Sequence, residues 1–351
     1  MACYHPLKGF PIGTTKTGKT EYMITGYYAD HVEKVSNGGE KSDWQVAHDS
    51  FVSPGALRSV SDFVQIPCGE CIGCRLDYSR DWANRCMLEL GYHDHSAFVT
   101  LTYDDAHIPY STVTDPDTGE IAFNQTLNKR DFQLFMKRLR KNYHNRFPDR
   151  PELRFYACGE YGSQTYRPHY HAIIYGLALD DLQFYRCTPN GDILYTSEFL
   201  SDCWQHQGYV VVGEVTWESC AYVARYIMKK LKGQFAEFYE TTNITPEFTL
   251  MSRRPGIARQ YYDDHPDLYE YDNLFISMSD GGREIRPPRY YDRLYDVDYP
   301  DHMAAIKENR KKFAEEQTKI KLSKCSYSYL EMLQVEEDHK KAQIKSLRRS
   351  L

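Results

Sequence analysis

The sequence lacks long hydrophobic runs and an excess of basic charge. No stretch of its 351 residues approaches the roughly 18 apolar residues that a membrane helix needs, so we expect no contact with a membrane. The segment Met1–Pro6 has neither the charged nor the apolar part of a signal peptide. Lys and Arg number 43 against 49 Asp and Glu, and the net charge of −6 excludes an all-over basic coat but not a local basic groove.

What is present is typical of a globular protein of one or two domains, with 41% hydrophobic and 26% charged residues. Ten cysteines without a secretion signal indicate reduced thiols or a metal site, not disulfides. The 30 tyrosines are unusual. They fit a Tyr-rich core and surface, and they equally fit stacking of unpaired bases on aromatic faces.

Hydrophobic patterning predicts an α+β fold. Periodicity indicates strands at 98–103, 153–158, 168–175 and 209–215, and helices at 127–146, 197–206 and 218–232. This order of elements matches the split βαβ class of antiparallel sheets.

Four segments are predicted along the chain: 1–96, 97–233, 234–302 and 303–351. The first reads as irregular up to a Cys-rich stretch and a helix near 76–91. The second contains the predicted sheet. The third reads as loops around a basic island, and the fourth as a charged helical tail with a break near 323–328.

The pattern His169-Tyr170-His171 lies on a predicted strand, where alternate residues share a face. The two imidazoles therefore lie side by side and Tyr170 points away. A hairpin with the preceding strand would bring Glu160 near them. Two imidazoles and a carboxylate can hold a divalent cation with positions left open. The alternative is a histidine pair without a ligand.

On the predicted helix 218–232, Tyr222, Tyr226 and Lys229 fall within an arc of about 60°. An apolar face remains for burial on the opposite side. A nearby cation favours the phenolate form of tyrosine. A metal that polarises a phosphate and a tyrosine that attacks it would give a covalent tyrosyl–DNA linkage. The alternative is two half-buried tyrosines at a core margin.

Together these residues resemble a known family. His169-Tyr170-His171 resembles the HUH motif (His, bulky residue, His), with Tyr170 at a position that is usually aliphatic. The stretch 222–229 resembles the two-tyrosine motif of rolling-circle initiators. With Pro67–Cys74 and Ser252–Arg259, the combination resembles the replication initiators of gokushoviruses, small circular single-stranded DNA phages of the microvirus group.

The resemblance implies an HUH-type catalytic domain, with Mg²⁺ or Mn²⁺ as cofactor. It implies nicking of replicative-form phage DNA through a 5′-phosphotyrosine, a free 3′-hydroxyl for the host polymerase, and later strand closure in the host cytoplasm. The sequence has no Gly-x4-Gly-Lys-Ser/Thr pattern, so a host helicase is expected.

Three other functions fit parts of this pattern. One is a single-stranded DNA-binding protein whose histidine pair is inert. Another is a metal-dependent phosphoesterase that uses activated water. The third is a transposase or relaxase of the same superfamily.

A second candidate metal site is the cysteine cluster, Cys68, Cys71 and Cys74, with Cys86 on the following helix as a fourth thiol. Four thiolates suit a structural Zn²⁺. An iron–sulfur cluster and buried reduced thiols are the alternatives.

DNA phosphates require Arg or Lys partners. The residues chosen for this role lie on the basic face of helix 127–146 and on the basic island: Lys137, Arg138, Lys141, Arg253, Arg254 and Arg259. Solvated surface charge is the alternative.

Overall fold

The computed structural model describes residues 3–16, 18–36, 42–48, 51–162, 164–189, 191–226, 236–271, 273–278 and 281–346. The chain forms two compact units. One combines Met1–Asp77 with Arg310–Arg348, and the other is built from Tyr78–Asn309. The four-segment division predicted from the sequence stays a prediction.

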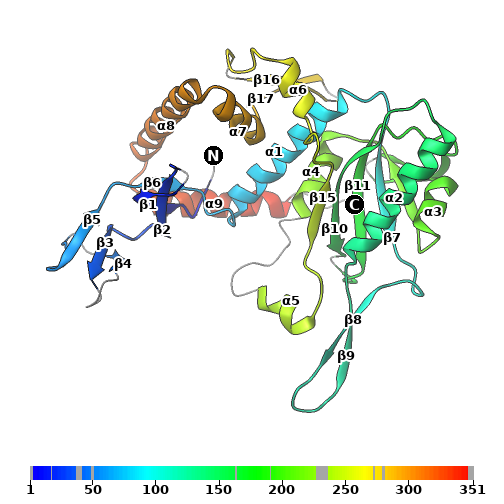
Figure 1. Ribbon diagram of the computed structural model, residues 1–351, viewed down its shortest axis with the longest axis horizontal. Coiled ribbons are helices and arrows are strands. Elements are labelled where there is room, and N and C mark those ends of the chain that lie inside the picture. The colour runs from blue at the N-terminus through cyan, green and yellow to red at the C-terminus, as the bar shows by residue number, and fades with distance from the viewer. Residues whose placement is uncertain are drawn as a thin grey trace. The chain divides into compact units, whose positions relative to one another are not determined.

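The larger unit contains a seven-stranded antiparallel sheet in the order β12-β13-β14-β7-β11-β10-β15 (Figure 1). Its strands are β7 (Ser96–Thr102), β10 (Arg154–Tyr161), β11 (Pro168–Tyr175), β12 (Gln183–Cys187), β13 (Ile193–Thr196), β14 (Val210–Gly213) and β15 (Phe248–Met251). The four predicted strands are β7, β10, β11 and β14, and the predicted α+β class with an antiparallel sheet is confirmed. Because β11 lies between β7 and β10, it splits the β7–α2–β10 unit.

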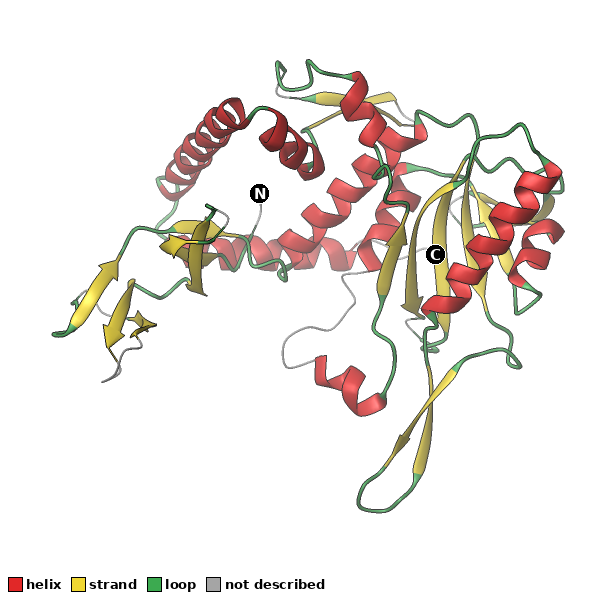
Figure 2. Ribbon diagram, in the orientation of Figure 1, coloured by secondary structure: helices red, strands yellow, loops and turns green. Residues whose placement is uncertain are grey.

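Helices cover both faces of this sheet (Figure 2). On one face lie α2 (Lys129–Arg146) and α3 (Glu198–Trp204), and on the other lie α1 (Ile72–Leu90) and α4 (Trp217–Tyr226). Alternate residues of β11 accordingly enter two different cores. Tyr170 packs in the core under α2, whereas Ile173 and Tyr175 pack in the core shared with α1 and α4.

Helix α2 forms where the sequence predicts it. The side chain of Asn128 accepts a hydrogen bond from the backbone N–H of Arg130 and caps the helix. Its predicted apolar stripe is buried, and the members are Phe132, Phe135, Met136, Leu139 and Tyr143. The capping residue and the helical spacing thus account for the position of α2 against the sheet.

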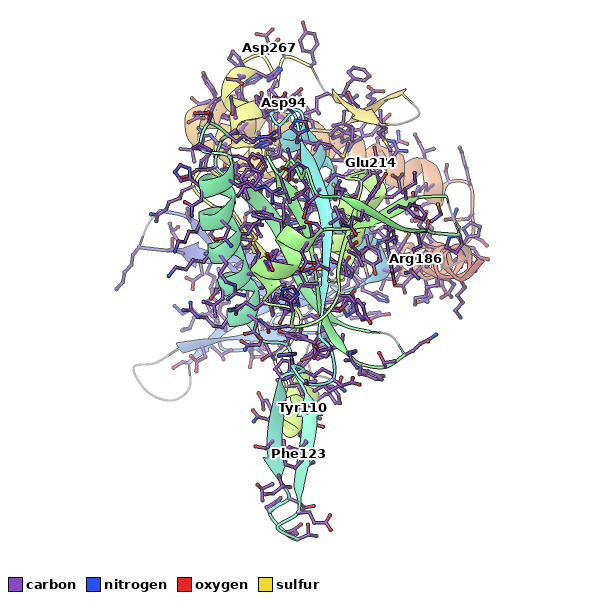
Figure 3. All side chains as sticks on the ribbon, turned by 90° about the vertical axis from the view of Figure 1, so that its right-hand side faces the viewer. Asp94, Tyr110, Phe123, Arg186, Glu214 and Asp267 are labelled. Carbon is purple, nitrogen blue, oxygen red and sulfur yellow. The ribbon has the colours of Figure 1, made fainter. Side chains whose placement is uncertain are left out.

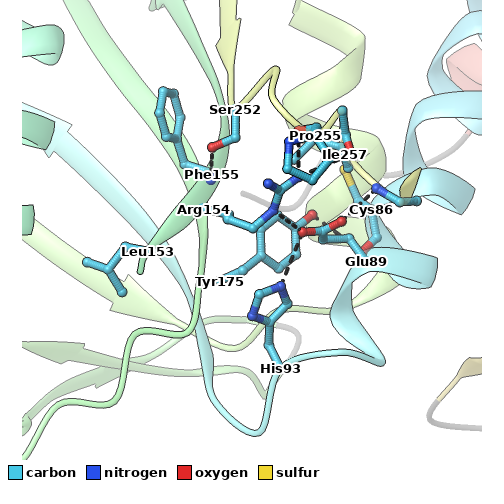
Figure 4. Close-up of polar contacts among 12 residues, drawn as sticks. Cys86, Glu89, His93, Leu153, Arg154, Phe155, Tyr175, Ser252, Pro255 and Ile257 are labelled. Carbon is cyan, nitrogen blue, oxygen red and sulfur yellow. Dashed lines mark hydrogen bonds and ion pairs between the residues drawn. The ribbon is translucent and has the colours of Figure 1, made fainter. Parts of the chain in front are cut away.

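The basic island is packed, contrary to the prediction of a loop-like region. Figure 4 shows the buried carboxylate of Glu89, on α1, between Arg154 of β10 and the segment around Pro255. Glu89 accepts hydrogen bonds from Arg154 and from the backbone N–H of Ala258. Burial raises the pKa of Glu89, but its bonds to His93, Ala258 and Arg154 outweigh this effect and lower it. A long-range ion-pair network therefore holds residues that local propensity leaves unstructured.

Further elements occur in the same unit, in segments for which loops or no elements were predicted. They are a hairpin of β8 (Tyr110–Thr114) and β9 (Ile121–Gln125), a hairpin of β16 (Leu274–Met278) and β17 (Gly281–Ile285), and three helices, α5 (Glu237–Thr242), α6 (Arg259–Asp264) and α7 (Arg289–Asp298). The β8–β9 hairpin extends away from the sheet and carries Tyr110 and Phe123, which are exposed (Figure 3).

The smaller unit contains two three-stranded antiparallel sheets, so the prediction of an irregular N-terminal region was wrong. Their orders are β2-β1-β6 and β4-β3-β5. The strands are β1 (Leu7–Thr14), β2 (Thr20–Gly26), β3 (His31–Ser36), β4 (Ser42–Ala47), β5 (Ala56–Val60) and β6 (Val64–Ile66). The predicted helical tail with its break is confirmed as α8 (Pro300–Leu322) and α9 (Tyr329–Ser346).

None of the helices within the described residues has the length and apolar character needed to cross a lipid bilayer.

Tyr170, between the two histidines, is a structural residue. Its hydroxyl donates to the backbone carbonyl of Asn128 (2.8 Å) and lies 2.8 Å from the hydroxyl of Tyr103. Tyr170→Phe leaves these buried groups without their partner, so we expect the free energy of unfolding to fall by about 1–3 kcal/mol in denaturant titrations. The matched change Tyr209→Phe affects a side chain that is 73% exposed and should change stability little. Equal stability of the two variants would contradict this role of Tyr170.

Candidate active site

Two central strands bring the three predicted metal ligands together. In the β10–β11 register, Glu160 lies opposite His169, and Cys158 lies opposite His171. The three side chains therefore point to one face of the sheet. The Nε2 atoms of His169 and His171 lie 2.7 Å and 3.0 Å from the same atom, Oε1 of Glu160.

The other ring nitrogens are held by outer partners. Nδ1 of His169 donates to the backbone carbonyl of Arg167 (3.0 Å), and Nδ1 of His171 lies 2.9 Å from the hydroxyl of Thr100. Because a carbonyl only accepts, Nδ1 of His169 carries a hydrogen and Nε2 is left to face Glu160. Thr100 was missed from the sequence. Its signal was alternation on β7, which places it opposite His171.

The electrostatics of this group favour a carboxylate. Glu160 is only 1% exposed, and burial by itself raises the pKa of its carboxyl. Hydrogen bonds and charge interactions with His169 and His171 outweigh burial and lower the pKa to about 2. Glu160 therefore stays ionised at neutral pH on a face that excludes most water.

The donor set fits a divalent cation. One ligand atom from each of Glu160, His169 and His171 lies within 4.8 Å of the others. Two imidazole nitrogens and a carboxylate oxygen are ligands that suit first-row divalent metals and leave positions for water and substrate oxygen. The hydrogen bonds at both Nδ1 atoms are the outer contacts that usually orient ligating histidines.

Tyr222 reaches this site from α4. Its ring centre lies 5.0 Å from that of His171, in an edge-on arrangement, and 6.3 Å from that of Phe98. The predicted apolar side of α4 is buried, since Val223 and Ala224 are fully covered in the core. The helix thus buries its apolar side and leaves Tyr222 partly exposed beside a histidine.

Two predicted residues of this helix are not fully described. Tyr226 is the last described residue of α4, but its side chain lies outside the described part. Lys229 lies entirely outside the described residues. Their predicted roles stay predictions.

The cysteine cluster differs from the prediction in one member. Cys68, Cys71 and Cys74 lie together, but the fourth thiol among them is Cys3. Cys86 is fully buried in the core of the larger unit, where its carbonyl accepts a hydrogen bond from Tyr175. It lies twelve residues beyond Cys74 on one continuous helix, or about 18 Å along the axis, which is too far to share an ion. Only the cysteine count hinted at Cys3, because no spacing rule links residues so far apart.

The predicted phosphate-binding residues do not form one surface with the triad. Lys137 and Lys141 are exposed on α2, which covers the opposite face of the sheet. Arg138 donates to the carbonyl of Cys203 (2.7 Å), and Arg259 pairs with Asp263. Arg253 and Arg254 are exposed on the loop after β15. Contact of these side chains with DNA stays a prediction.

Comparisons with known proteins agree with the predicted resemblance. A family model for replication-associated proteins of the ORF2 type matches residues 96–231. Replication-associated protein ORF2 of Spiroplasma virus 4 is 33% identical over 290 residues, covering 82% of this chain and 85% of that protein. Replication-associated protein VP4 of Bdellovibrio phage phiMH2K is 31% identical over 262 residues, covering 72% and 76%.

A third relative is Replication-associated protein ORF4 of Chlamydia phage 1, which is 30% identical over 193 residues, covering 53% of this chain and 44% of that protein. No solved structure matches the chain. The family match covers β7, the histidine strand β11 and α4, which are the elements that build the site. On these similarities, the chain belongs to the family of microvirus replication-associated proteins.

Proposed function

We propose that this protein is a rolling-circle replication initiator of the HUH type, which nicks phage replicative-form DNA at the origin and later rejoins the displaced strand. One observation carries the proposal. The Nε2 atoms of His169 and His171 converge on one carboxylate oxygen of Glu160, and the ring of Tyr222 stands against His171. A metal-ligand set and a nucleophile of the required kinds are therefore neighbours.

Glu160, His169 and His171 would hold Mg²⁺ or Mn²⁺. When bound, such an ion supplies charge neutralisation for a nonbridging phosphate oxygen. The chain orients these ligands through the carbonyl of Arg167 and the hydroxyl of Thr100. The covered position of Glu160 keeps its carboxylate aimed at both imidazoles.

Tyr222 is the first nucleophile in this proposal, and Tyr226, one turn further on α4, takes the next transfer. The tyrosine oxygen bonds to phosphorus and its phenol proton is lost. The bond from phosphorus to the 3′ oxygen breaks, and that oxygen takes up a proton. The products are a 5′-phosphotyrosine and a free 3′-hydroxyl for the host polymerase. Attack by a 3′-hydroxyl on the phosphotyrosine reverses these steps and closes the strand.

Several parts of the proposal come from the resemblance and the sequence. Lys229, on the same predicted helix face as the tyrosines, would favour the phenolate form. The exposed residues among Lys137, Lys141, Arg253 and Arg254 would contact phosphates. A host helicase would open the duplex, and the reaction would take place in the host cytoplasm.

A covalent-adduct assay tests the proposal. Full-length protein is incubated with labelled single-stranded DNA that spans the replication origin of the parent phage, with Mn²⁺ or with EDTA, and is then denatured. We expect label on the protein only with Mn²⁺. The double change Tyr222→Phe/Tyr226→Phe should reduce the adduct at least about 100-fold, because the attacking oxygens are gone. His171→Ala should do the same with both tyrosines present.

Tyr110→Phe is the matched control, because Tyr110 lies exposed on the β8–β9 hairpin, and this variant should form normal adduct. Cleavage without an adduct would contradict the tyrosine mechanism and favour attack by water. Binding without cleavage would favour a single-stranded DNA-binding protein. Adduct in the double variant would move the nucleophile elsewhere in the chain.

A pair of threonines tests how the metal ligands are positioned. Thr100 and Thr102 lie on β7 opposite His171 and His169, but only the Thr100 hydroxyl reaches a histidine nitrogen. The Thr102 hydroxyl donates to the carbonyl of Tyr209. Thr100→Val should weaken Mn²⁺ binding by roughly 10–100-fold, measured by calorimetry, because outer partners set the orientation of ligating histidines.

Thr102→Val is expected to change Mn²⁺ affinity by less than about 3-fold, since its hydroxyl orients no ligand. Equal losses in the two variants would show that Thr100 acts through general strand stability and has no specific contact with the ligand.

A further inference from the structure

We propose that Cys3, Cys68, Cys71 and Cys74 bind one structural zinc ion in the smaller unit. Their four Sγ atoms lie within 4.8 Å of one another, and all four are free thiols. The site shares no residue with the Glu160–His169–His171 group. Its existence therefore does not depend on the proposed nicking activity.

The spacing of the sulfurs suits a single ion. A tetrahedral zinc ion with Zn–S bonds of about 2.3 Å sets its sulfurs about 3.8 Å apart. The Sγ atoms of Cys68 and Cys74 are 4.0 Å apart. Clusters with several irons spread their cysteine ligands more widely. Four sulfurs gathered this tightly thus favour one tetrahedral ion.

Backbone N–H groups point at the sulfurs in a repeated turn. Sγ of Cys68 accepts from the N–H of Glu70 (3.4 Å) and of Cys71 (3.3 Å), and Sγ of Cys71 accepts from the N–H of Cys74 (3.4 Å). Each turn spans a Cys-x-x-Cys step. Donors of this kind stabilise thiolates, which are the form that binds zinc.

The chain terminus joins the same network. The N–H of Cys68 donates to Sγ of Cys3, and the N–H of Tyr4 donates to Sγ of Cys71, both at 3.3 Å. These reciprocal bonds bring a ligand from 65 residues away into register with the Cys-rich turn. A chance gathering of buried thiols would not require such matched donors.

The surroundings can balance a negative site. Four thiolates around Zn²⁺ carry a net charge of about −2. Cys71 and Cys74 lie at the start of α1, where the helix dipole favours negative charge. The side chains of Arg75 and Lys341 line the same surface hollow as Cys71.

The ion would fasten the two ends of the chain within this unit. Cys3, Tyr4, Cys71 and Cys74 form a buried cluster with Met332 and Leu333 of α9. This cluster is small, and a metal is a usual means of stabilising such a core. The proposed role is therefore structural: zinc holds the N-terminal segment against the Cys-rich turn, while α9 packs on the same cluster.

Metal content of two matched variants tests the proposal. Cys3→Ser removes a ligand. Cys325→Ser changes a cysteine that packs on the same cluster but lies outside the four-thiol group. Full-length proteins purified with reductant are analysed by mass spectrometry for zinc per chain. We expect Cys325→Ser to match the unchanged protein and Cys3→Ser to lose one equivalent. Because both variants keep the histidine site, zinc bound there cancels in the comparison.

A second measurement needs no variant. Cobalt exchanged into the unchanged protein should give the intense near-ultraviolet thiolate-to-cobalt band and visible bands of a tetrahedral tetrathiolate site. An unchanged protein without this spectrum would overturn the proposal, even if Cys3→Ser fails to fold. Equal zinc in Cys3→Ser and Cys325→Ser would overturn it as well, as would an iron–sulfur spectrum.

Discussion

The sharing of one carboxylate oxygen by two imidazoles is the interaction on which the rest of this site depends. It requires that β10 and β11 pair in one register, because Glu160 must lie opposite His169 with His171 two residues further along. A shift by one residue would turn the histidines to the other face. The same register places Gly159 opposite Tyr170, where an added Cβ would lie 2.8 Å from the ring of Phe248. The fit of that glycine on one face thus supports the position of the ligands on the other.

The two faces of the sheet divide the work. Under α2, large aromatic side chains such as Tyr170 and Trp204 fill a closed core. Under α1 and α4, the core is apolar away from the site, and the polar group of Glu160, His169 and His171 occupies its margin beside Tyr222. A ligand set on two central strands is held more rigidly than one on loops, which suits chemistry that requires fixed geometry.

Local patterns were sufficient for the elements that build this site and insufficient elsewhere. The apolar stripe of α2, the alternation in β7 and the strand at 168–175 each carry a period that one segment displays alone. Alternation also predicted that Tyr170 faces away from the histidines. By contrast, the folding of the N-terminal strands, the anchoring of the basic island by Glu89 and the approach of Cys3 to Cys68 depend on contacts between distant residues. No local period encodes such contacts, and for this reason Cys86 was chosen in place of Cys3.

The central claim is that Glu160, His169 and His171 together hold a divalent ion. Electron spin-echo spectroscopy of bound Mn²⁺ tests it most directly, in protein with ¹⁵N-labelled histidine. The account predicts couplings to the nitrogens of two imidazoles, reduced to one in His169→Ala. A Mn²⁺ signal with no imidazole nitrogen coupling, at the stoichiometry of one ion per chain, would contradict it.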